Sequence, residues 1–179
     1  MIFSTFFNFF LLISIIGYSY LYKKIFKKDN TNISNLDILY GILILFFLSL
    51  ILHFFFPLKY FFFIVILFGF FSFIIAFYNK KINLNLFFYF LIIFFYIFIS
   101  YYNGDNVDSP MYHLQIIKWL YNDKIALGLP NLEIRFGSNS LWFNFLSLLQ
   151  FKYNNFNSIY LINILPFSIL TYEILNYRH

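Results

Sequence analysis

The stretch Ile38–Phe56, ILYGILILFFLSLILHFFF, decides the class of fold, because it is apolar from end to end and carries no fixed charge. A helix needs roughly 20 such residues to cross the hydrocarbon core of a bilayer. Pro57 and Lys59 close the run, and His53 lies near its end. The stretch therefore predicts a transmembrane helix, with His53 interpreted as an interfacial histidine beside a turn.

Four further apolar runs of similar length occur along the chain: Ile2–Leu21, Tyr60–Tyr78, Leu84–Tyr102 and Ser158–Tyr177. The 179 residues are 62% hydrophobic and 11% charged, whereas a soluble domain is about 25% charged. We therefore predict an all-α fold: a polytopic integral membrane helical bundle of about five transmembrane helices, with additional extracytoplasmic interfacial helices.

The distribution of lysines predicts the orientation of these helices. The connectors after the first and third runs contain Lys23, Lys24, Lys27, Lys28, Lys80 and Lys81. The connector between the second and third runs contains Lys59 alone. Because cytoplasmic loops carry the excess of Lys and Arg, we expect the N-terminus and the central part of the chain on the extracytoplasmic side of the membrane. The net charge of +5 then needs no nucleic-acid partner, and the absence of cysteine excludes disulfides and thiolate metal sites.

The predicted domain organisation follows from these runs. Residues 1–102 form four transmembrane helices with short connectors, residues 103–157 an extracytoplasmic loop with interfacial helices, and residues 158–179 a fifth transmembrane helix. The loop holds the longest polar stretch, Asn103–Trp142. Four of the seven acidic residues lie there: Asp105, Asp108, Asp123 and Glu133. Chemistry is therefore expected on this loop.

Two helices are predicted within the loop. The first runs from Pro110 to about Asn122, with Asp108 or Ser109 as its cap. At 100° per residue one narrow arc is polar, formed by Gln115, Lys118 and Asn122. Such an amphipathic helix is typical of a membrane interface, where Trp119 would anchor at headgroup level. The second, Ser140–Phe151, is too short to cross and is expected to lie on, or dip into, the outer face.

Each polar residue of the loop has two interpretations. Asp108 is either a helix cap or a catalytic or ligand-binding carboxylate, and Asp105 either a turn residue or part of the site. His113 is either packed in apolar surroundings or takes part in phosphate binding or proton transfer. Lys118 and Arg135 contact either solvent and lipid headgroups or a substrate phosphate. Trp142 is an interface anchor or a platform for a sugar.

Four segments of the loop resemble a known group of proteins: DSPMYHLQ (108–115), IKW (117–119), GLPNL (128–132) and RFGSNSLWF (135–143). They are similar to a segment of large bacterial membrane proteins, which in turn resemble the GT-C superfamily of polytopic glycosyltransferases. That superfamily uses polyprenyl-phosphate sugars. An early extracytoplasmic loop there carries an acidic motif followed by an aromatic residue.

The resemblance implies that Asp108 is the catalytic carboxylate and Tyr112 its aromatic companion. The candidate substrate-binding residues are Asp105, Tyr112, His113, Lys118, Arg135, Asn139 and Trp142. No resident cofactor is predicted, and a divalent metal stays open. The acidic motif of the GT-C superfamily is typically a pair of acidic residues, and Ser109 occupies the second of these positions here. Asp105 would therefore have to supply the second carboxylate for a metal. GT-C enzymes also have more spans than the five predicted here, so the chain is expected to be the N-terminal part of a longer protein.

Two functions follow as hypotheses. In the first, a sugar is transferred from a polyprenyl-phosphate donor to an extracytoplasmic acceptor during cell-envelope glycan assembly. In the second, the protein is a non-catalytic membrane component, such as a lipid-linked glycan transporter or partner subunit, and its loop binds lipid headgroups or another chain. The expected partners are therefore the donor lipid, the bilayer and, in the second hypothesis, another membrane protein.

Overall fold

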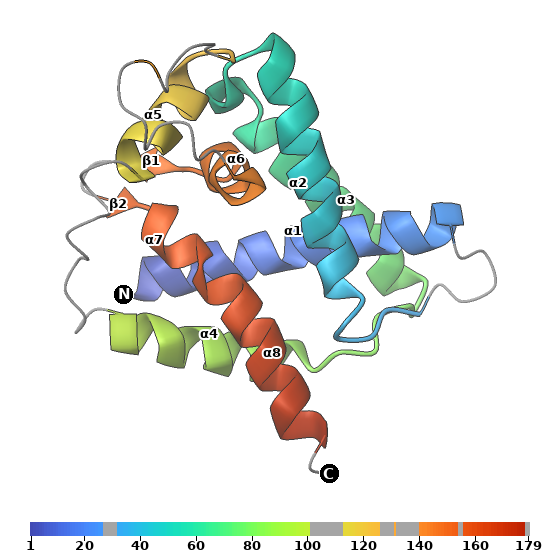
Figure 1. The fold of residues 1–179 in the computed structure, drawn as a ribbon. Coiled ribbons are helices and arrows are strands. Elements are labelled where there is room, and N and C mark those ends of the chain that lie inside the picture. Colours follow the sequence, from blue (N-terminus) through green and yellow to red (C-terminus); the bar gives the residue numbers. More distant parts are fainter. Residues whose placement is uncertain (27–31, 101–112, 126–130, 132–139, 154–155, 178–179) are drawn as a thin grey trace. The chain divides into compact units, whose positions relative to one another are not determined.

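The computed structural model describes residues 1–26, 32–100, 113–125, 131, 140–153 and 156–177, and these residues are mainly helical (Figure 1). The elements are α1 (Ile2–Phe26), α2 (Ile38–Phe55), the short 3-10 helix η1 (Leu58–Tyr60), α3 (Phe62–Tyr78), α4 (Leu86–Ser100), α5 (Leu114–Asn122), α6 (Leu141–Leu148), α7 (Ile159–Ile162) and α8 (Ile164–Tyr177). Two antiparallel strands of two residues each, β1 (Lys152–Tyr153) and β2 (Phe156–Asn157), form a small hairpin. The prediction of a helical fold is confirmed.

Two of the described helices, α1 with 25 residues and α2 with 18, are long and apolar enough to cross a membrane. The remaining apolar helices are shorter: α3 has 17 residues, α4 has 15 and α8 has 14. The fifth predicted run is divided between α7 and α8. Pro166 lies in the first turn of α8, where its missing N–H is tolerated, but its ring would clash with the carbonyl of Ile162 in a continuous helix.

The chain forms two compact units. The first, called the bundle unit here, comprises Met1–Ile44, Ile64–Asn103 and Tyr160–His179. The second, the loop unit, comprises Leu45–Phe63 and Gly104–Ile159.

In the bundle unit, α1 and α3 approach closely at a pair of glycines. A Cβ atom on Gly17 would collide with the carbonyl oxygen of Gly69. Small residues allow the backbones of two helices to approach in this way. Beside the crossing, the Ser14 hydroxyl donates to the Ile66 carbonyl at 3.0 Å, and the Tyr18 hydroxyl donates to the Val65 carbonyl at 2.8 Å.

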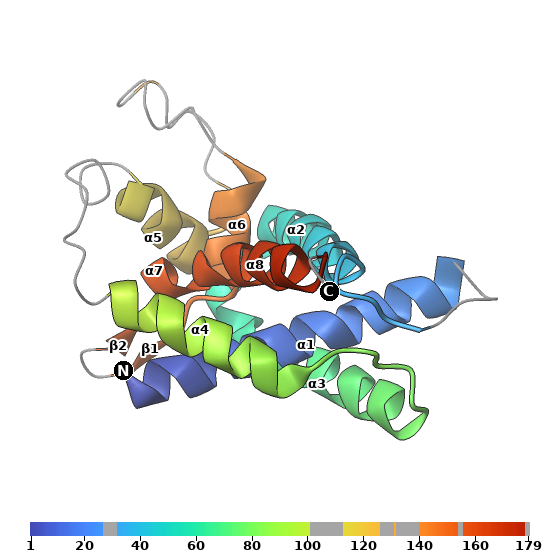
Figure 2. The same cartoon turned by 90° about the horizontal axis from the view of Figure 1, so that it is seen from below.

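Helix α4 packs against both α1 and α8 (Figures 1 and 2). The rings of Tyr89 and Tyr172 stack with centroids 4.2 Å apart. The hydroxyls of Tyr96 and Thr171 lie 2.6 Å apart. Aromatic side chains thus supply part of the contact between α4 and α8.

One end of the bundle unit gathers the connectors that are rich in lysine. The Ile33 N–H donates to the Lys81 carbonyl at 2.7 Å, and Ile33 and Ile82 form a parallel bridge. Asn35 Nδ2 donates to Glu173 Oε2 of α8 at 2.6 Å. We call this part of the bundle unit the basic end. The connectors after α1 and α3 therefore lie at the same end, as the predicted topology requires.

In the loop unit, α5 packs against α6 and η1. The predicted polar arc is confirmed, because Gln115, Lys118 and Asn122 are exposed. The opposite side of α5 is buried, with Ile116, Ile117 and Leu120 each at most 6% exposed. This apolar side is covered by protein rather than left free for lipid. The reason is that α6 contributes a buried surface of its own, formed by residues 144–148.

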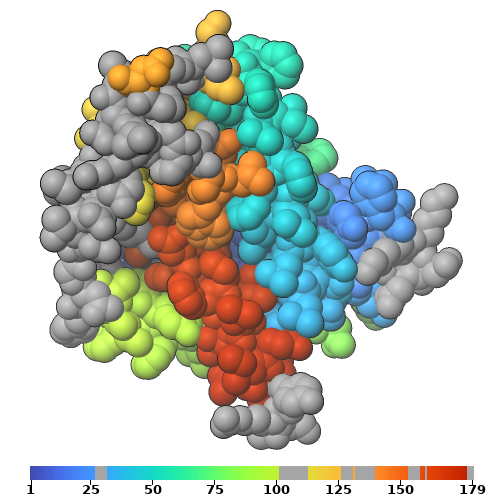
Figure 3. Space-filling view, viewed as in Figure 1, coloured from blue at the N-terminus to red at the C-terminus, as the bar shows by residue number. Residues whose placement is uncertain are grey.

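Large apolar side chains are exposed along several helices. On α2 they recur every fourth residue, and Figure 3 shows α2 and α8 at the surface. The exposed residues include Leu39, Leu43, Phe47 and Ile51 on α2; Ile64, Leu67, Phe68, Phe71 and Ile75 on α3; Phe87, Leu91, Phe95 and Phe98 on α4; and Phe167, Leu170 and Ile174 on α8. Neither α3 nor α4 contains a charged residue. Contiguous apolar surfaces of this kind mark contact with a membrane or another protein.

Candidate functional site

Three of the candidate site residues are described by the structure: His113, Lys118 and Trp142. The others lie outside the described residues, so their predicted roles remain predictions: Asp105, Asp108, Tyr112, Arg135 and Asn139.

His113 and Trp142 lie where α5 meets α6 in the loop unit. The half-buried imidazole of His113 packs on the Phe143 ring, with centroids 5.3 Å apart. The neighbouring Trp142 is also half-buried and packs edge-on against Phe46 of α2, with centroids 5.7 Å apart. The structure thus brings His113 close to the start of α6, beside Trp142.

Lys118 lies on the exposed side of α5. Its carbonyl accepts a hydrogen bond from Asn122 Nδ2 at 2.9 Å, which belongs to the polar arc of the helix. Its ammonium group is accessible to a phosphate from solvent or from a membrane surface. The exposed position is compatible with both interpretations of Lys118 that the sequence leaves open.

Helix α6 begins at the predicted place. Ser140 has extended backbone angles of φ −122° and ψ 149°, and its carbonyl accepts from the Phe143 N–H at 3.0 Å. Its hydroxyl makes no capping hydrogen bond. Ser140 therefore occupies the N-cap position without contributing the side-chain bond that a serine cap usually supplies.

The loop unit also contains buried polar groups that the sequence analysis does not identify as a site. Asn144 and Gln150 are each 1% exposed, and His53 is 4% exposed. Within the described part of the chain, Asn144 Oδ1, both polar side-chain atoms of Gln150, and His53 Nδ1 have no hydrogen-bond partner. We call these three residues the polar interior of the loop unit. His53 lies in the last turn of α2, as predicted, and its side chain is enclosed by protein.

Unpaired buried polar atoms are costly, at about 1–3 kcal/mol each. Neighbouring hydroxyls in the same unit are paired. Ser147 Oγ donates to the Ile117 carbonyl at 3.4 Å, and Ser158 Oγ accepts from the Phe151 N–H at 2.8 Å. The polar interior therefore holds one amide donor and several acceptors that no group in the described part of the chain satisfies. In the sequence, Asn144 could have been noticed as an amide side chain in α6, whose other residues apart from Ser147 are apolar.

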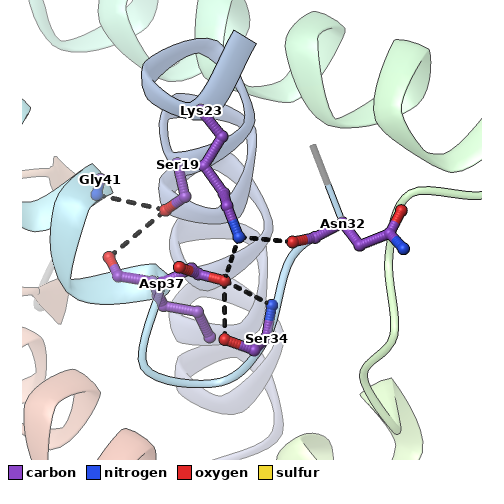
Figure 4. Close-up of polar contacts among 7 residues, drawn as sticks. Ser19, Lys23, Asn32, Ser34, Asp37 and Gly41 are labelled. Carbon is purple, nitrogen blue, oxygen red and sulfur yellow. Dashed lines mark hydrogen bonds and ion pairs between the residues drawn. The ribbon is translucent and has the colours of Figure 1, made fainter. Parts of the chain in front are cut away.

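A second polar cluster lies at the basic end of the bundle unit (Figure 4). Lys23 Nζ lies 2.6 Å from Asp37 Oδ2 and donates to the Asn32 carbonyl at 2.6 Å. The same carboxylate oxygen accepts from the Ser34 N–H at 2.8 Å and from the Ser34 hydroxyl at 2.6 Å. Lys23 is 5% exposed and Asp37 is 8% exposed. The sequence pattern predicts Lys23 only as one of a basic group, whereas the structure shows it buried in an ion pair.

The electrostatics of Asp37 follow from these contacts. Burial by itself raises the pKa of the Asp37 carboxyl, but hydrogen bonds from Lys23 and Ser34, together with the positive charge of Lys23, outweigh it. The net effect holds the pKa of Asp37 below its ordinary value. Asp37 is therefore a charged structural partner of Lys23 rather than a group suited to exchange protons near neutral pH.

No group of three or more His, Cys, Asp or Glu side chains in the described part of the chain could hold a metal ion. The carboxylates for which the sequence leaves a divalent metal open, Asp105 and Asp108, do not belong to that part.

The fold and its exposed apolar helices define a mainly helical protein with two helices able to cross a membrane. A family match over residues 1–179 assigns it further: the chain belongs to the family described as Domain of unknown function (DUF8201). No curated protein and no solved structure matches the chain.

Proposed function

We propose that this chain is a polytopic inner-membrane protein that transfers a sugar from a polyprenyl-phosphate donor to an extracytoplasmic acceptor in cell-envelope glycan assembly. The observation that carries the proposal is the polar interior of the loop unit. It belongs to the same unit as the segment that resembles GT-C enzymes, and it offers buried hydrogen-bonding atoms. Sugars are rich in hydroxyl groups that can donate to, and accept from, amides and imidazoles.

The exposed apolar surfaces of α2, α3, α4 and α8 support the membrane location. An α4 of 15 residues has a length of about 22 Å, less than the hydrocarbon thickness of about 30 Å. A shorter helix is accommodated by local thinning of the bilayer at modest cost. Helices α3 and α8 are also shorter than the hydrocarbon thickness and can be accommodated in the same way. All five apolar helices can therefore belong to one membrane bundle.

In the proposed reaction, the Asp108 carboxylate takes the proton from an acceptor hydroxyl. The acceptor oxygen then bonds to the anomeric carbon of the sugar, and the bond from that carbon to the phosphate oxygen breaks. The polyprenyl phosphate leaves with the electron pair. Lys118 and Arg135 hold its negative charge, Arg135 in two-pronged fashion.

The test is a comparison of Asp108→Asn with the gene deletion in the native bacterium. We expect the Asn variant to insert normally, yet to accumulate polyprenyl-phosphate sugar as the deletion does, measured by mass spectrometry of lipid extracts. The matched control is Asp123→Asn, because Asp123 is exposed at the end of α5 and has no proposed role. Wild-type lipid levels in the Asp108→Asn strain would rule out catalysis by this carboxylate.

The second candidate function is that of a non-catalytic component of envelope assembly. The exposed Lys118 beside Trp119 on α5 favours it, because this pair suits contact with lipid headgroups. In that case Lys118→Gln and Trp119→Ala would impair glycan assembly more than Asp108→Asn does. Comparing the levels of polyprenyl-phosphate sugar in the three variants, by mass spectrometry of lipid extracts, therefore separates the two functions.

A further inference from the structure

We propose that the basic end of the bundle unit binds an anionic phospholipid in a hollow lined by Phe77, Tyr78, Lys80 and Ile82. The inference rests on the proposed membrane location and is independent of sugar transfer. The hollow has a volume of about 400 Å³ and adjoins the end of α3. Among the described residues that line it, Phe77, Tyr78 and Ile82 are apolar or aromatic, and Lys80 brings an ammonium group.

The backbone of Lys80 has a conformation that is rare for a lysine. Lys80 has φ 52°, the left-handed region that favours glycine. The Lys80 N–H donates to the Phe77 carbonyl at 3.0 Å, and the Lys81 N–H donates to the Ala76 carbonyl at 3.0 Å. These two bonds form the Schellman motif that ends a helix, in which glycine or asparagine usually occupies the left-handed position. A lysine there is unfavourable for the turn, so its side chain is expected to serve another purpose.

The two carboxylates described at the basic end already have partners. Asp37 is bound by Lys23, and Glu173 accepts from Asn35. No ion pair joins Lys80 to a carboxylate among the residues that the structure describes. Its positive charge is therefore available to an external anion at this end of the bundle unit.

The walls of the hollow identify the anion as that of a lipid. Phe77 is 59% exposed and Tyr78 is 81% exposed, which is unfavourable in water and favourable against an acyl chain and glycerol backbone. A lipid phosphate beside Lys80, with its chain along Phe77 and Ile82, would satisfy both the charge and the apolar surface. The predicted cytoplasmic side of the membrane is also where anionic lipids attract basic residues.

The experiment measures binding of phosphatidylglycerol and phosphatidylcholine to the purified chain in non-ionic detergent by native mass spectrometry. We expect preferential binding of phosphatidylglycerol, reduced about fivefold by Lys80→Gly, the loss expected for one lysine near the surface. Glycine suits the left-handed turn, so this variant should fold, and its circular dichroism and thermal midpoint should match or exceed those of the wild type. Lys80→Gln should show the same loss of lipid.

The matched control is Lys24→Gln, which removes a charge from the exposed end of α1 and not from the hollow. It should retain phosphatidylglycerol. An equal loss in Lys24→Gln, unchanged binding in Lys80→Gly, or equal binding of the two lipids would overturn the proposal. Displacement of the lipid by millimolar inorganic phosphate would do so too, since the site would then recognise phosphate alone. Asp108→Asn should bind lipid normally, so failure of sugar transfer and failure of this site are distinguishable.

Discussion

At the scale of single residues, the ion pair of Lys23 and Asp37 is the clearest case in which burial decides the energetics. Two buried charges contribute little net stability as a pair, because desolvation offsets their attraction. Removing one partner is different, since it leaves the other charge buried and uncompensated. The Ser34 hydroxyl would also lose its acceptor if Asp37 were replaced, and the Asn32 carbonyl would lose its donor if Lys23 were replaced.

We therefore predict that Asp37→Asn destabilises the protein by about 3–5 kcal/mol. The double variant Lys23→Met with Asp37→Leu should recover most of this loss, because no isolated charge remains. The free energy of unfolding, measured with denaturant in detergent micelles, checks both values. Asp123→Asn is the control for a carboxylate on the surface and should change stability by less than about 0.5 kcal/mol. Equal stability of the double variant and Asp37→Asn would contradict this explanation.

The polar interior leads to a prediction with opposite effects on stability and activity. Gln150→Leu removes two unpaired buried polar atoms while keeping a similar volume, so it should raise the free energy of unfolding by about 1–3 kcal/mol. If these atoms bind the sugar, the same variant should accumulate the polyprenyl-phosphate donor in cells. Unfolding in detergent and lipid mass spectrometry give the two readouts.

Ser147→Ala is the matched control, because its hydroxyl already has a partner, the Ile117 carbonyl. It should lower stability by about 0.5–1.5 kcal/mol and leave donor levels unchanged. A stabilised Gln150→Leu protein with normal donor levels would show that the polar interior is a structural imperfection with no part in transfer.

The partners of these residues could not be predicted from the sequence. The pattern places Lys23 after an apolar run and Asp37 before the next one, but nothing local indicates that they meet. The same holds for Gln150, which follows a short apolar segment and is buried only because α6 packs against α5 and η1. Burial of a polar side chain depends on the tertiary contacts of its element, and sequence periodicity does not contain them.

At the scale of helices, the boundaries were largely predictable. The run Ile38–Phe56 ends where Pro57 prevents continuation, and α2 spans Ile38–Phe55. The polar arc of α5 was predicted for a related reason: hydrophobic and polar residues with a period of 3.6 show directly in the sequence. The covering of its apolar side by α6 was not predicted, since composition cannot distinguish lipid from a neighbouring helix.

The crossing of α1 and α3 gives a prediction in which two effects compete. Alanine is favoured over glycine within a helix by roughly 1 kcal/mol, which alone would make Gly17→Ala stabilising. The added methyl group would collide with the carbonyl of Gly69, a backbone atom that cannot move without separating the helices. We therefore expect Gly17→Ala to lower the free energy of unfolding by about 1–3 kcal/mol, the usual cost of overpacking. An increase in stability would mean that α1 and α3 are less closely packed than described.

At the scale of the whole molecule, the predicted topology is open to a direct test because the sequence contains no cysteine. A single introduced cysteine is then the sole target of a membrane-impermeant maleimide. Lys24→Cys and Asn79→Cys place it at the basic end, the first in the last turn of α1 and the second in the connector after α3. Both sites are exposed, and the excess of lysine predicts both to be cytoplasmic. They should react only after the membrane is permeabilised.

Asp123→Cys provides the opposite case, because the loop unit is predicted to be extracytoplasmic and Asp123 is exposed at the end of α5. It should react in spheroplasts with an intact inner membrane, at a rate close to that after permeabilisation. Labelling of Lys24→Cys in intact spheroplasts would reverse the orientation. The loop would then face the cytoplasm, where an extracytoplasmic acceptor is absent, and the proposed transfer would fail together with the topology. Agreement of all three sites would leave the loop on the side that the reaction requires and the lysines on the side of the anionic lipid.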